Sequence, residues 1–321
     1  MKAIAIYEYG STSAMHYTDV ADPPLQPDQV RVKVRAIGVN PVDWKIREGV
    51  LKVVTGKDFP RVLGSDLAGE VVEVGSQVTD FKPGDAIYGS LNALKGGAYA
   101  EYAVLSTNAI APKPANINYE EAAAIPVPGL TALQALRDQG KIQTGQKVLV
   151  NGASGGVGTL AVQIAKAYGA EVTGVCSGKN IELVESLGCD RIINYKQDDF
   201  TKGSERYQII FDTVAKRSFD ECKPVMTSNG IYVTTLPSAA SVIQGILSAI
   251  LPGKKLKFVV AKPNRQDFLK LNELTESGQM RVVVDRTYPL SDAAEAHAYS
   301  ETEHAAGKII LVPDSVMFIA S

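Results

Sequence analysis

The chain has 321 residues, of which 45% are hydrophobic and 21% charged, the balance of an ordinary globular protein; its length predicts two domains. Its formal net charge is −2, so the totals give no indication of binding to nucleic acid or to an anionic membrane. The three cysteines, Cys176, Cys189 and Cys222, form no C-x-x-C pair, which argues against a disulfide framework and against structural zinc. No signal peptide or membrane-spanning apolar run is visible, so we expect a cytoplasmic protein.

Short strands predominate in the first part of the chain. Residues 29–40 ("QVRVKVRAIGVN") alternate between polar and apolar at period two, and residues 66–78 and 97–105 follow with further strand patterns. Only short helical segments fit here, such as residues 42–49. The first 120 residues therefore predict a β-rich domain.

The pattern changes near Glu120. A helical pattern interrupted by Pro126 and Pro128 covers residues 119–140, and strands and helices then alternate. The strand patterns lie at 147–152, 171–176, 191–195, 207–214 and 230–235, and the helical patterns lie at 157–169 and 180–188. This alternation predicts βαβ units and a parallel sheet.

The chain after Pro263 carries a helical pattern at 266–278, a strand at 280–290, a helix near 292–303 and a last strand at 307–313. We expect this tail to return to the first domain. The apolar end at 316–321 is far shorter than a membrane span, which favours a docked or frayed terminus over membrane contact.

A glycine-rich turn follows the strand at 147–152. The dinucleotide fingerprint is G-x-G-x-x-G, and the segment Ala153, Ser154, Gly155, Gly156, Val157, Gly158 matches it with alanine at the first position. Gly155 would let the backbone approach a pyrophosphate, and Gly158 would let the helix pack closely on the strand. Because the turn links a strand to an amphipathic helix, it predicts dinucleotide binding rather than a purely structural turn.

The residues after the strand at 171–176 indicate whether the chain binds NAD or NADP. NAD-binding chains place a carboxylate about 20 residues on, at the ribose hydroxyl. Here the segment is "VCSGKN", with Ser177 and Lys179, and no acidic residue occurs before Glu182. A hydroxyl and a cation suit a 2′-phosphate, so the sequence favours NADPH, with an ordinary surface lysine as the alternative for Lys179.

Six stretches together resemble a known family. They are 39–49 ("VNPVDWKIREG"), 63–89, 96–104, 120–136, 150–174 and 305–313 ("AAGKIILVP"). In this order they resemble the zinc-independent quinone-oxidoreductase branch of the medium-chain dehydrogenase/reductase superfamily, and most closely its plant chloroplast-envelope quinone oxidoreductase homologue and alkenal/enone reductases.

The resemblance implies an α/β fold in which a GroES-like β-barrel catalytic domain is interrupted by a Rossmann domain. The expected bounds are 1–122 and 263–321 for the catalytic domain and 123–262 for the NADP-binding doubly wound sheet. The resemblance further implies an active site in the cleft between the domains, and a homodimer built through the Rossmann sheets.

The positions that bind catalytic zinc in related enzymes hold other residues here. Asn40 stands in place of a cysteine, and Ser65-Asp66 in place of a His-Glu pair. Neither Asn nor Ser is a normal zinc ligand, and the four-cysteine lobe is missing. The histidines His16, His297 and His304 lack ligand spacing, so we expect surface or packing roles for them and no metal.

A metal-free enzyme can still direct a nicotinamide hydride to an electrophilic carbon, as in quinones and α,β-unsaturated carbonyls. Asn40 is the first candidate near the reacting centre, with a turn residue before Pro41 as the alternative. Asp43 and Lys45 lie on the next turn. Lys45, where many quinone oxidoreductases carry tyrosine, would donate to the oxyanion or a cofactor phosphate, or be a solvated lysine.

The resemblance also carries over further cofactor contacts. Thr131 corresponds to a hydroxyl near the nicotinamide, Tyr195 to a tyrosine beside the 2′-phosphate, Leu236 to a residue at the nicotinamide side, and Lys308 to a cation reaching the cofactor. For Tyr195 and Leu236, ordinary core packing is the alternative.

Two alternatives to the reductase stay open. Relatives serve as lens proteins or bind RNA, and only residues 251–258 ("LPGKKLKF") resemble a basic stripe; a solvated loop before a strand is the simpler interpretation. A zinc alcohol dehydrogenase would require bound metal. We therefore expect a small electrophile, quinone or enone, as substrate, and no nucleic acid as partner.

Overall fold

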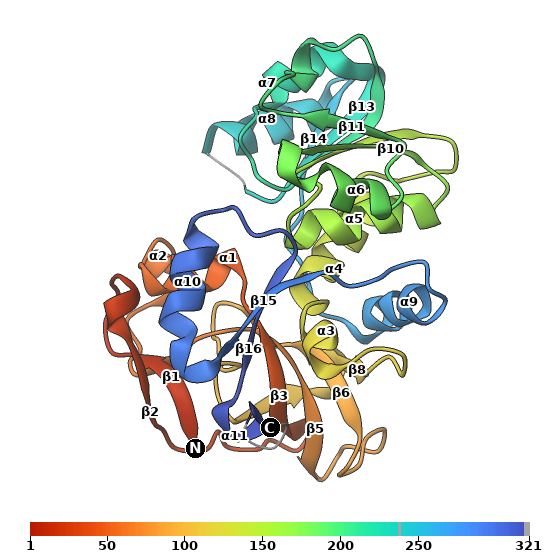
Figure 1. The fold of residues 1–321 in the computed structure, drawn as a ribbon. Helices are drawn as coiled ribbons and strands as arrows, with labels where there is room; N and C mark the ends of the chain where they lie inside the picture. Colours follow the sequence, from red (N-terminus) through yellow and green to blue (C-terminus); the bar gives the residue numbers. More distant parts are fainter. Residues whose placement is uncertain (237–238, 318–321) are drawn as a thin grey trace. The chain divides into compact units, whose positions relative to one another are not determined.

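The computed structural model describes residues 1–236 and 239–317, which form two compact units (Figure 1). Unit 1 contains Met1–Val127, Pro263–Glu276 and the chain from Val282 onward, and unit 2 contains Pro128–Lys262 and Ser277–Arg281. The chain thus returns to its first unit after Lys262. Of the apolar end, residues 318–321 lie outside the described residues.

Unit 1 is built on two β-sheets. The larger has the order β15-β16-β3-β5-β6-β8, with β7 also paired to β3, and the smaller has the order β2-β1-β4. All pairs are antiparallel except β15 and β16. The strands are β1 (Lys2–Ile6), β2 (Met15–Asp19), β3 (Gln29–Gly38), β4 (Arg61–Val62), β5 (Asp66–Val74), β6 (Ala86–Ser90), β7 (Tyr102–Ser106), β8 (Ile110–Pro112), β15 (Val284–Pro289) and β16 (Lys308–Val312).

The period-two pattern of residues 29–40 becomes β3, the strand at the centre of this sheet. Val30, Val32 and Val34 face the core, while the residues between them are partly exposed. β3 pairs with β5 and β7 along most of its length and with β16 at its end. The buried alternation thus places the residues that follow β3, Val39 and Asn40, next to the last strand of the chain.

Most of the helices of unit 1 are short, and α9 is the longest that the structure describes there. They are α1 (Pro41–Arg47), α2 (Lys52–Thr55), α3 (Tyr119–Ala123), α9 (Arg265–Glu276), α10 (Ala293–Glu301) and α11 (Asp314–Met317). α1 begins at Pro41 because proline suits the first helical position, and Asn40 and Asp43 form a capping box around it. α4 (Pro126–Leu133) crosses the boundary between the units and continues as a π-helix, η3 (Gln134–Gln139).

Unit 2 contains a six-stranded parallel sheet with the order β11-β10-β9-β12-β13-β14. Its strands are β9 (Lys147–Asn151), β10 (Glu171–Cys176), β11 (Arg191–Asn194), β12 (Tyr207–Asp212), β13 (Met226–Thr234) and β14 (Lys255–Phe258). Numbered from the first strand of the unit, this order is 3-2-1-4-5-6, which is the Rossmann arrangement. The predicted parallel sheet is present, with β14 as an additional edge strand.

The helices of unit 2 are α5 (Gly156–Ala167), α6 (Ile181–Ser186), α7 (Phe219–Cys222) and α8 (Ala239–Ile250). Six 3₁₀ helices complete the described structure, η1 (Thr12–Ala14) and η2 (Thr107–Ala109), η4 (Gly178–Asn180) and η5 (Phe200–Lys202), and η6 (Lys223–Val225) and η7 (Leu290–Asp292). The sequence patterns did not predict α8. The basic stretch 251–258, expected as a loop, contains β14.

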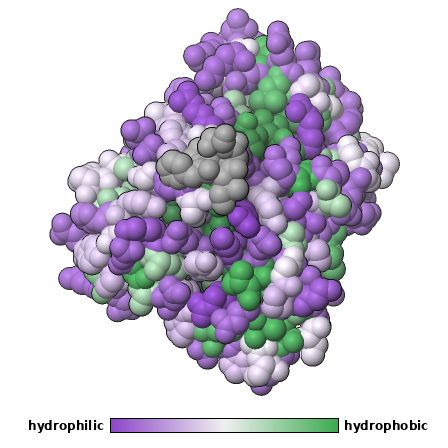
Figure 2. Space-filling view, turned by 60° about the horizontal axis from the view of Figure 1, so that its bottom comes forward, coloured by the Kyte–Doolittle hydropathy of each residue, from purple (hydrophilic) through white to green (hydrophobic). Residues whose placement is uncertain are grey.

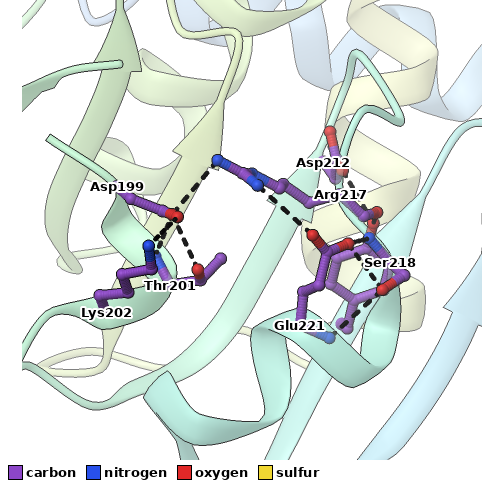
Figure 3. Close-up of polar contacts among 8 residues, drawn as sticks. Asp199, Thr201, Lys202, Asp212, Arg217, Ser218 and Glu221 are labelled. Atoms are coloured by element: carbon purple, nitrogen blue, oxygen red, sulfur yellow. Dashed lines mark hydrogen bonds and ion pairs between the residues drawn. The ribbon is translucent and has the colours of Figure 1, made fainter. Parts of the chain in front are cut away.

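A buried carboxylate stabilises the end of β12 (Figure 3). Asp212, labelled in Figure 3, is fully buried. Its Oδ1 accepts hydrogen bonds from the Asn151 side chain at 3.0 Å and from the backbone N–H of Ala215 at 2.8 Å. Tyr232 donates to Asp212 Oδ2 at 2.8 Å and to the Arg217 carbonyl at 2.7 Å. These bonds hold the ends of neighbouring strands together at the edge of the sheet where the glycine turn lies.

Candidate active site

The glycine turn after β9 forms a cradle suited to a phosphate. α5 begins at Gly156 with Gly155 as its N-cap, so the first N–H groups of this helix have no partner within it. A Cβ atom on Gly155 would have one neighbour within 4 Å, the Gly152 carbonyl oxygen at 3.6 Å. The space beside Gly155 is open, and the positive end of the helix dipole favours an anion there, which fits a dinucleotide pyrophosphate.

Two other glycines give the turn its shape. A Cβ atom on Gly158 would lie 2.0 Å from the Gly152 carbonyl oxygen, so the helix packs on the turn as closely as predicted. Gly152 has a φ of +84°, a left-handed conformation that side chains other than glycine rarely adopt. The turn is therefore tight at Gly152 and Gly158 and open at Gly155.

Most predicted cofactor residues lie at one edge of the sheet in unit 2. Ala153 to Gly158 follow β9, Ser177 and Lys179 follow β10, Tyr195 follows β11, and Leu236 follows β13. Cys176 and Asn194 are register partners, and the Tyr195 N–H donates to the Cys176 carbonyl at 3.1 Å. Because the carboxyl ends of parallel strands share one edge, Ser177 and Tyr195 leave neighbouring strands side by side, as a nucleotide site in this fold requires.

The predicted cofactor residues differ in how far their side chains are exposed to solvent. Lys179 is exposed and Ser177 is buried, while Tyr195 is 54% and Leu236 46% exposed. The core-packing alternative for Tyr195 and Leu236 is therefore wrong. Thr131, predicted near the nicotinamide, is buried on α4 rather than at the strand ends.

In unit 1, Asn40 lies in a buried polar cluster with Asp66 and Lys308, which we call the Asn40 cluster. Asn40 Nδ2 donates to Asp66 Oδ2 at 2.9 Å, and Lys308 Nζ donates to Asn40 Oδ1 at 2.5 Å and to the Val39 carbonyl at 2.6 Å. An ammonium group can only donate, so Asn40 must turn its oxygen toward Lys308 and its nitrogen toward Asp66. The amide orientation of Asn40 is thus determined by its neighbours.

One N–H of Asn40 has only long contacts. Nδ2 lies 3.4 Å from the Gly38 carbonyl oxygen and 3.5 Å from Ser65 Oγ, at the limit of hydrogen bonding. The first N–H bonds to Asp66, so the second N–H has only these two long contacts. The positions that bind zinc in related enzymes here hydrogen-bond among themselves and to Lys308.

Burial shifts the pKa values of the two ionisable side chains in the Asn40 cluster, Asp66 and Lys308. Lys308 Nζ lies 3.7 Å from Asp66 Oδ2, and the two side chains are 6% and 0% exposed. Loss of hydration raises the pKa of Asp66 and lowers the pKa of Lys308, against the attraction between them. Lys308 thus lies in the Asn40 cluster as a donor to the Asn40 and Val39 carbonyl oxygens, whereas the sequence assigned it to the cofactor; that cofactor role stays a prediction.

Asp43 belongs to a second set of buried hydrogen bonds. Its Oδ2 accepts from the Asn40 N–H at 2.8 Å and from Tyr99 OH at 3.2 Å, and Tyr99 OH lies 3.0 Å from Nε2 of His297. Burial raises the pKa of Asp43 to about 7 and lowers the pKa of His297 to about 3. Asp43 thus caps α1, and its hydrogen bond to the Asn40 N–H holds the backbone of Asn40 in place. His297 has the packing role predicted for it.

Lys45, the remaining catalytic candidate, lies on α1 with its Nζ 5.2 Å from the centre of the Trp44 ring. It is partly exposed and lies outside the Asn40 cluster. Sequence reasoning missed Tyr99 as a partner of Asp43, and no local signal marks it.

Comparison with known proteins decides the family. The chain matches the model of the alcohol dehydrogenase GroES-like domain over residues 26–115 and that of zinc-binding dehydrogenases over residues 187–311. It is 36% identical over 324 residues to the chloroplast envelope quinone oxidoreductase homolog of Arabidopsis thaliana, covering 98% of each chain. It is also 36% identical over 328 residues to the NADPH-dependent alkenal/one oxidoreductase of that plant, covering 98% of this chain and 80% of the relative.

The chain belongs to the medium-chain dehydrogenase/reductase superfamily. Among solved structures of this superfamily, the quinone oxidoreductase from Coxiella burnetii is similar with a TM-score of 0.89 and 30% identity, covering 97% of this chain and 99% of the other. The Escherichia coli quinone oxidoreductase complexed with NADPH has a TM-score of 0.85 and 25% identity, covering 98% and 100%. The predicted fold class, a GroES-like domain with a Rossmann domain, is confirmed.

Zinc appears in the description of one matched superfamily model, but the described residues contain no group of three or more His, Cys, Asp or Glu side chains that could hold a metal. Asn40 and Ser65 replace nitrogen and sulfur ligands with weak donors. The residues present do not fit a catalytic zinc ion.

Gly158→Ala tests the packing of the cradle. The added methyl group would meet the Gly152 carbonyl, and forcing the helix away should lower the free energy of unfolding by about 1–3 kcal/mol. Urea unfolding measures this change. Gly155→Ala is the matched control, because its Cβ lies in open space and its φ of −82° suits alanine. Equal stability of the two variants would contradict the close packing.

Asp43→Asn tests the buried carboxyl. Since burial raises the pKa of Asp43 to about 7, the folded protein keeps a proton that the unfolded chain releases near pH 4, so this group's contribution to stability falls as the pH rises between these values. The asparagine variant lacks this titration. Urea unfolding across this range should show wild type losing stability relative to the variant, with a constant difference above the window. Parallel profiles would contradict the raised pKa.

Proposed function

We propose that the protein is a metal-independent reductase that transfers hydride from NADPH to quinones or α,β-unsaturated carbonyls, such as alkenals, enones and γ-ketols. The observation that carries the proposal is the Asn40 cluster. At the positions of zinc ligands it presents a carboxamide N–H, held in place by Asp66 and Lys308. Such a donor stabilises an oxyanion that forms on a conjugated acceptor, and it lacks the Lewis acidity that an alcohol substrate needs.

Bound NADPH would supply the hydride, and the chain would supply orientation and charge. The second N–H of Asn40 donates to the oxygen on which charge develops. Lys308 holds the amide in this orientation and makes the electrostatic potential at Asn40 more positive. Lys45, on the same helix as Asp43, donates to the oxyanion or to a cofactor phosphate. The proposal requires these residues to reach the nicotinamide of the bound cofactor.

The choice of NADPH rests on the end of β10. No carboxylate stands at Ser177 or Lys179 to accept a ribose hydroxyl, and Lys179 and Tyr195 are exposed where a 2′-phosphate would bind. Asn180 Nδ2 donates to Ser154 Oγ at 2.9 Å, which ties this segment to the phosphate cradle and leaves the Ser154 hydroxyl proton free for the cofactor. The NADPH named in the relatives supports this choice.

We further propose that the protein is a cytoplasmic homodimer. β14 is an outer strand of the six-stranded sheet, so its free edge can pair with the same strand of a second copy, as the resemblance implies. Among the residues that the structure describes, none of the helices has the length and apolar character needed to cross a membrane.

NADPH consumption with benzoquinone, phenanthrenequinone and trans-alkenals tests the function. We expect NADPH oxidation with at least one class, and the ratio of kcat/KM values decides between quinones and enones. NADPH binding without consumption of any acceptor would favour the alternative of a non-enzymatic NADPH-binding protein, crystallin-like or RNA-binding.

Lys179→Glu tests the cofactor assignment. Exchanging a cation for a carboxylate beside the 2′-phosphate removes a charge-assisted hydrogen bond of about 1.5–3 kcal/mol, so NADPH should bind about 10- to 100-fold more weakly. NADH lacks this phosphate and serves as the internal control. Cofactor fluorescence titration measures both dissociation constants. An equal loss for NADPH and NADH would contradict the role of Lys179.

A further inference from the structure

Four polar or charged side chains are buried in unit 1, although they come from three separate parts of the chain. The face of the molecule shown in Figure 2 is mostly hydrophilic, as expected where such side chains stay in water. Arg47, His297, Tyr99 and Asp43 are instead only 0% or 1% exposed. α10 lies beside α1 (Figure 1), which brings His297 next to Arg47. Groups of this kind are buried where they bond to one another.

The four side chains form a continuous series of contacts, which we call the Arg47 network. Arg47 Nη1 lies 3.5 Å from His297 Nδ1. His297 Nε2 lies 3.0 Å from Tyr99 OH, which in turn lies 3.2 Å from Asp43 Oδ2. Asp43 Oδ2 also accepts the Asn40 N–H at 2.8 Å. The Arg47 network therefore ends on the backbone of the residue whose amide belongs to the Asn40 cluster.

The other end of the Arg47 network is bound to carboxylates near the surface. Arg47 Nη1 pairs with Glu301 at 2.7 Å, and Nη2 pairs with Glu48 at 3.2 Å. Nε donates to the Gly10 carbonyl at 3.1 Å. These partners compensate the buried guanidinium charge and fix its position, so Arg47 is a permanent donor at this end of the network.

Arg47 determines the direction of every hydrogen bond in the network. A guanidinium group has N–H donors and no acceptor, so the nitrogen that faces it, His297 Nδ1, must be the one without a proton. His297 Nε2 then carries the ring proton and donates it to the Tyr99 oxygen. The Tyr99 proton is left for Asp43. Asp43 Oδ2 thus faces two donors, Tyr99 OH and Asn40 N–H, and is held as an acceptor.

This direction favours the ionised form of Asp43. A proton on Oδ2 would meet two donors, and Oδ1 has no hydrogen-bond partner among the residues that the structure describes. Burial acts the other way and raises the pKa of Asp43 to about 7. Burial also raises the pKa of Tyr99 well above its usual range and, with the charge of Arg47, lowers the pKa of His297 to about 3. Of the four members, Asp43 is therefore the one that changes charge near neutral pH.

The groups around Asp43 link its ionisation to the Asn40 cluster. Lys308 of β16 favours the Asp43 carboxylate and Asp66 of β5 opposes it, while Arg61 of β4 lines the same small space and donates to backbone carbonyls. In return, the charge of Asp43 acts to raise the pKa of Lys308, against the effect of burial. Ionised Asp43 therefore holds the backbone of Asn40 and favours the ammonium form of Lys308, which donates to Asn40 Oδ1.

We propose that Arg47, His297 and Tyr99 are positioning residues that keep Asp43 ionised and thereby hold Asn40 in the geometry for reduction. The inference rests on the proposed function, in which Asn40 donates to the substrate oxygen. The Arg47 network acts through hydrogen bonds and charge, and no proton has to pass along it. Reduction is accordingly fastest at pH values where Asp43 is ionised, and it slows as the pH falls and Asp43 takes up a proton.

Nuclear magnetic resonance of the full chain with isotope-labelled asparagine tests the positioning without substrate or cofactor. The Asn40 signals should titrate with a midpoint at about pH 7 as Asp43 ionises. Tyr99→Phe removes one donor to the carboxylate and should raise this midpoint by about one pH unit. Tyr88→Phe is the matched control, because it also loses a buried hydroxyl, which donates to the Phe268 carbonyl at 2.9 Å, and it should titrate as wild type does.

The pH profile of kcat/KM for NADPH-dependent reduction reports the same ionisation in the working enzyme. It should rise through about pH 7 in wild type and in Tyr88→Phe. In Tyr99→Phe the rise should come about one unit higher, which makes this variant about fivefold slower at pH 7 and equal to wild type above about pH 9. His297→Gln keeps a donor and an acceptor and should stay near wild type, whereas His297→Leu lacks both and should shift in the same direction as Tyr99→Phe.

Asn40 signals that do not titrate, or equal midpoints in wild type and Tyr99→Phe, would overturn the inference. A loss of activity in Tyr99→Phe that is the same at every pH would also overturn it, since it would assign Tyr99 to folding alone. The two His297 variants give an independent measurement, and equal pH profiles for leucine and glutamine at this position would contradict the directed network. If the Asn40 signals behave as predicted but no quinone or enone is reduced, the positioning stands and the proposed function is wrong.

Discussion

The catalytic unit depends on a buried ammonium group, Lys308, that is held by the residue following β3. Lys308 Nζ bonds to Val39 and Asn40, and Asn40 in turn bonds to Asp66. Removing one member of such a set leaves an uncompensated charge or polar group, at a cost of about 3–5 kcal/mol. The same bonds that make the cluster stable determine the direction of the Asn40 amide. The same hydrogen bonds therefore stabilise the fold and orient the Asn40 amide.

The two units meet the needs of hydride transfer in different ways. Unit 2 offers an anion site made of backbone, where Gly155 leaves open space beside a helix N-terminus. Unit 1 offers side-chain donors in a buried setting, where loss of hydration raises the pKa of Asp66 and lowers the pKa of Lys308. The Asn40 amide is a neutral, preorganised hydrogen-bond donor and a weaker electrophile than a zinc ion. It therefore suits acceptors that are already electrophilic, such as quinones and enones.

The sequence predicted those features that are local in the chain. The cradle residues are consecutive, and the alternation of strands and helices predicted the parallel sheet of unit 2. The hydrogen bonds of the Asn40 cluster could not be predicted from the sequence, because Asn40 and Lys308 are 268 residues apart in the chain. The pairing of β16 with β3 brings them together. α8 was missed for another reason. Its aliphatic residues face solvent, so its pattern does not mark the buried side from which a helix is normally predicted.

The claim that a protein cation and an amide do the work of a metal is tested most directly by metal removal. The purified protein would be dialysed against a strong chelator, its metal content measured, and its NADPH-dependent reduction of a quinone and an alkenal compared before and after. The account predicts unchanged kcat/KM values for a metal-free sample. Loss of activity that returns on addition of zinc would contradict it.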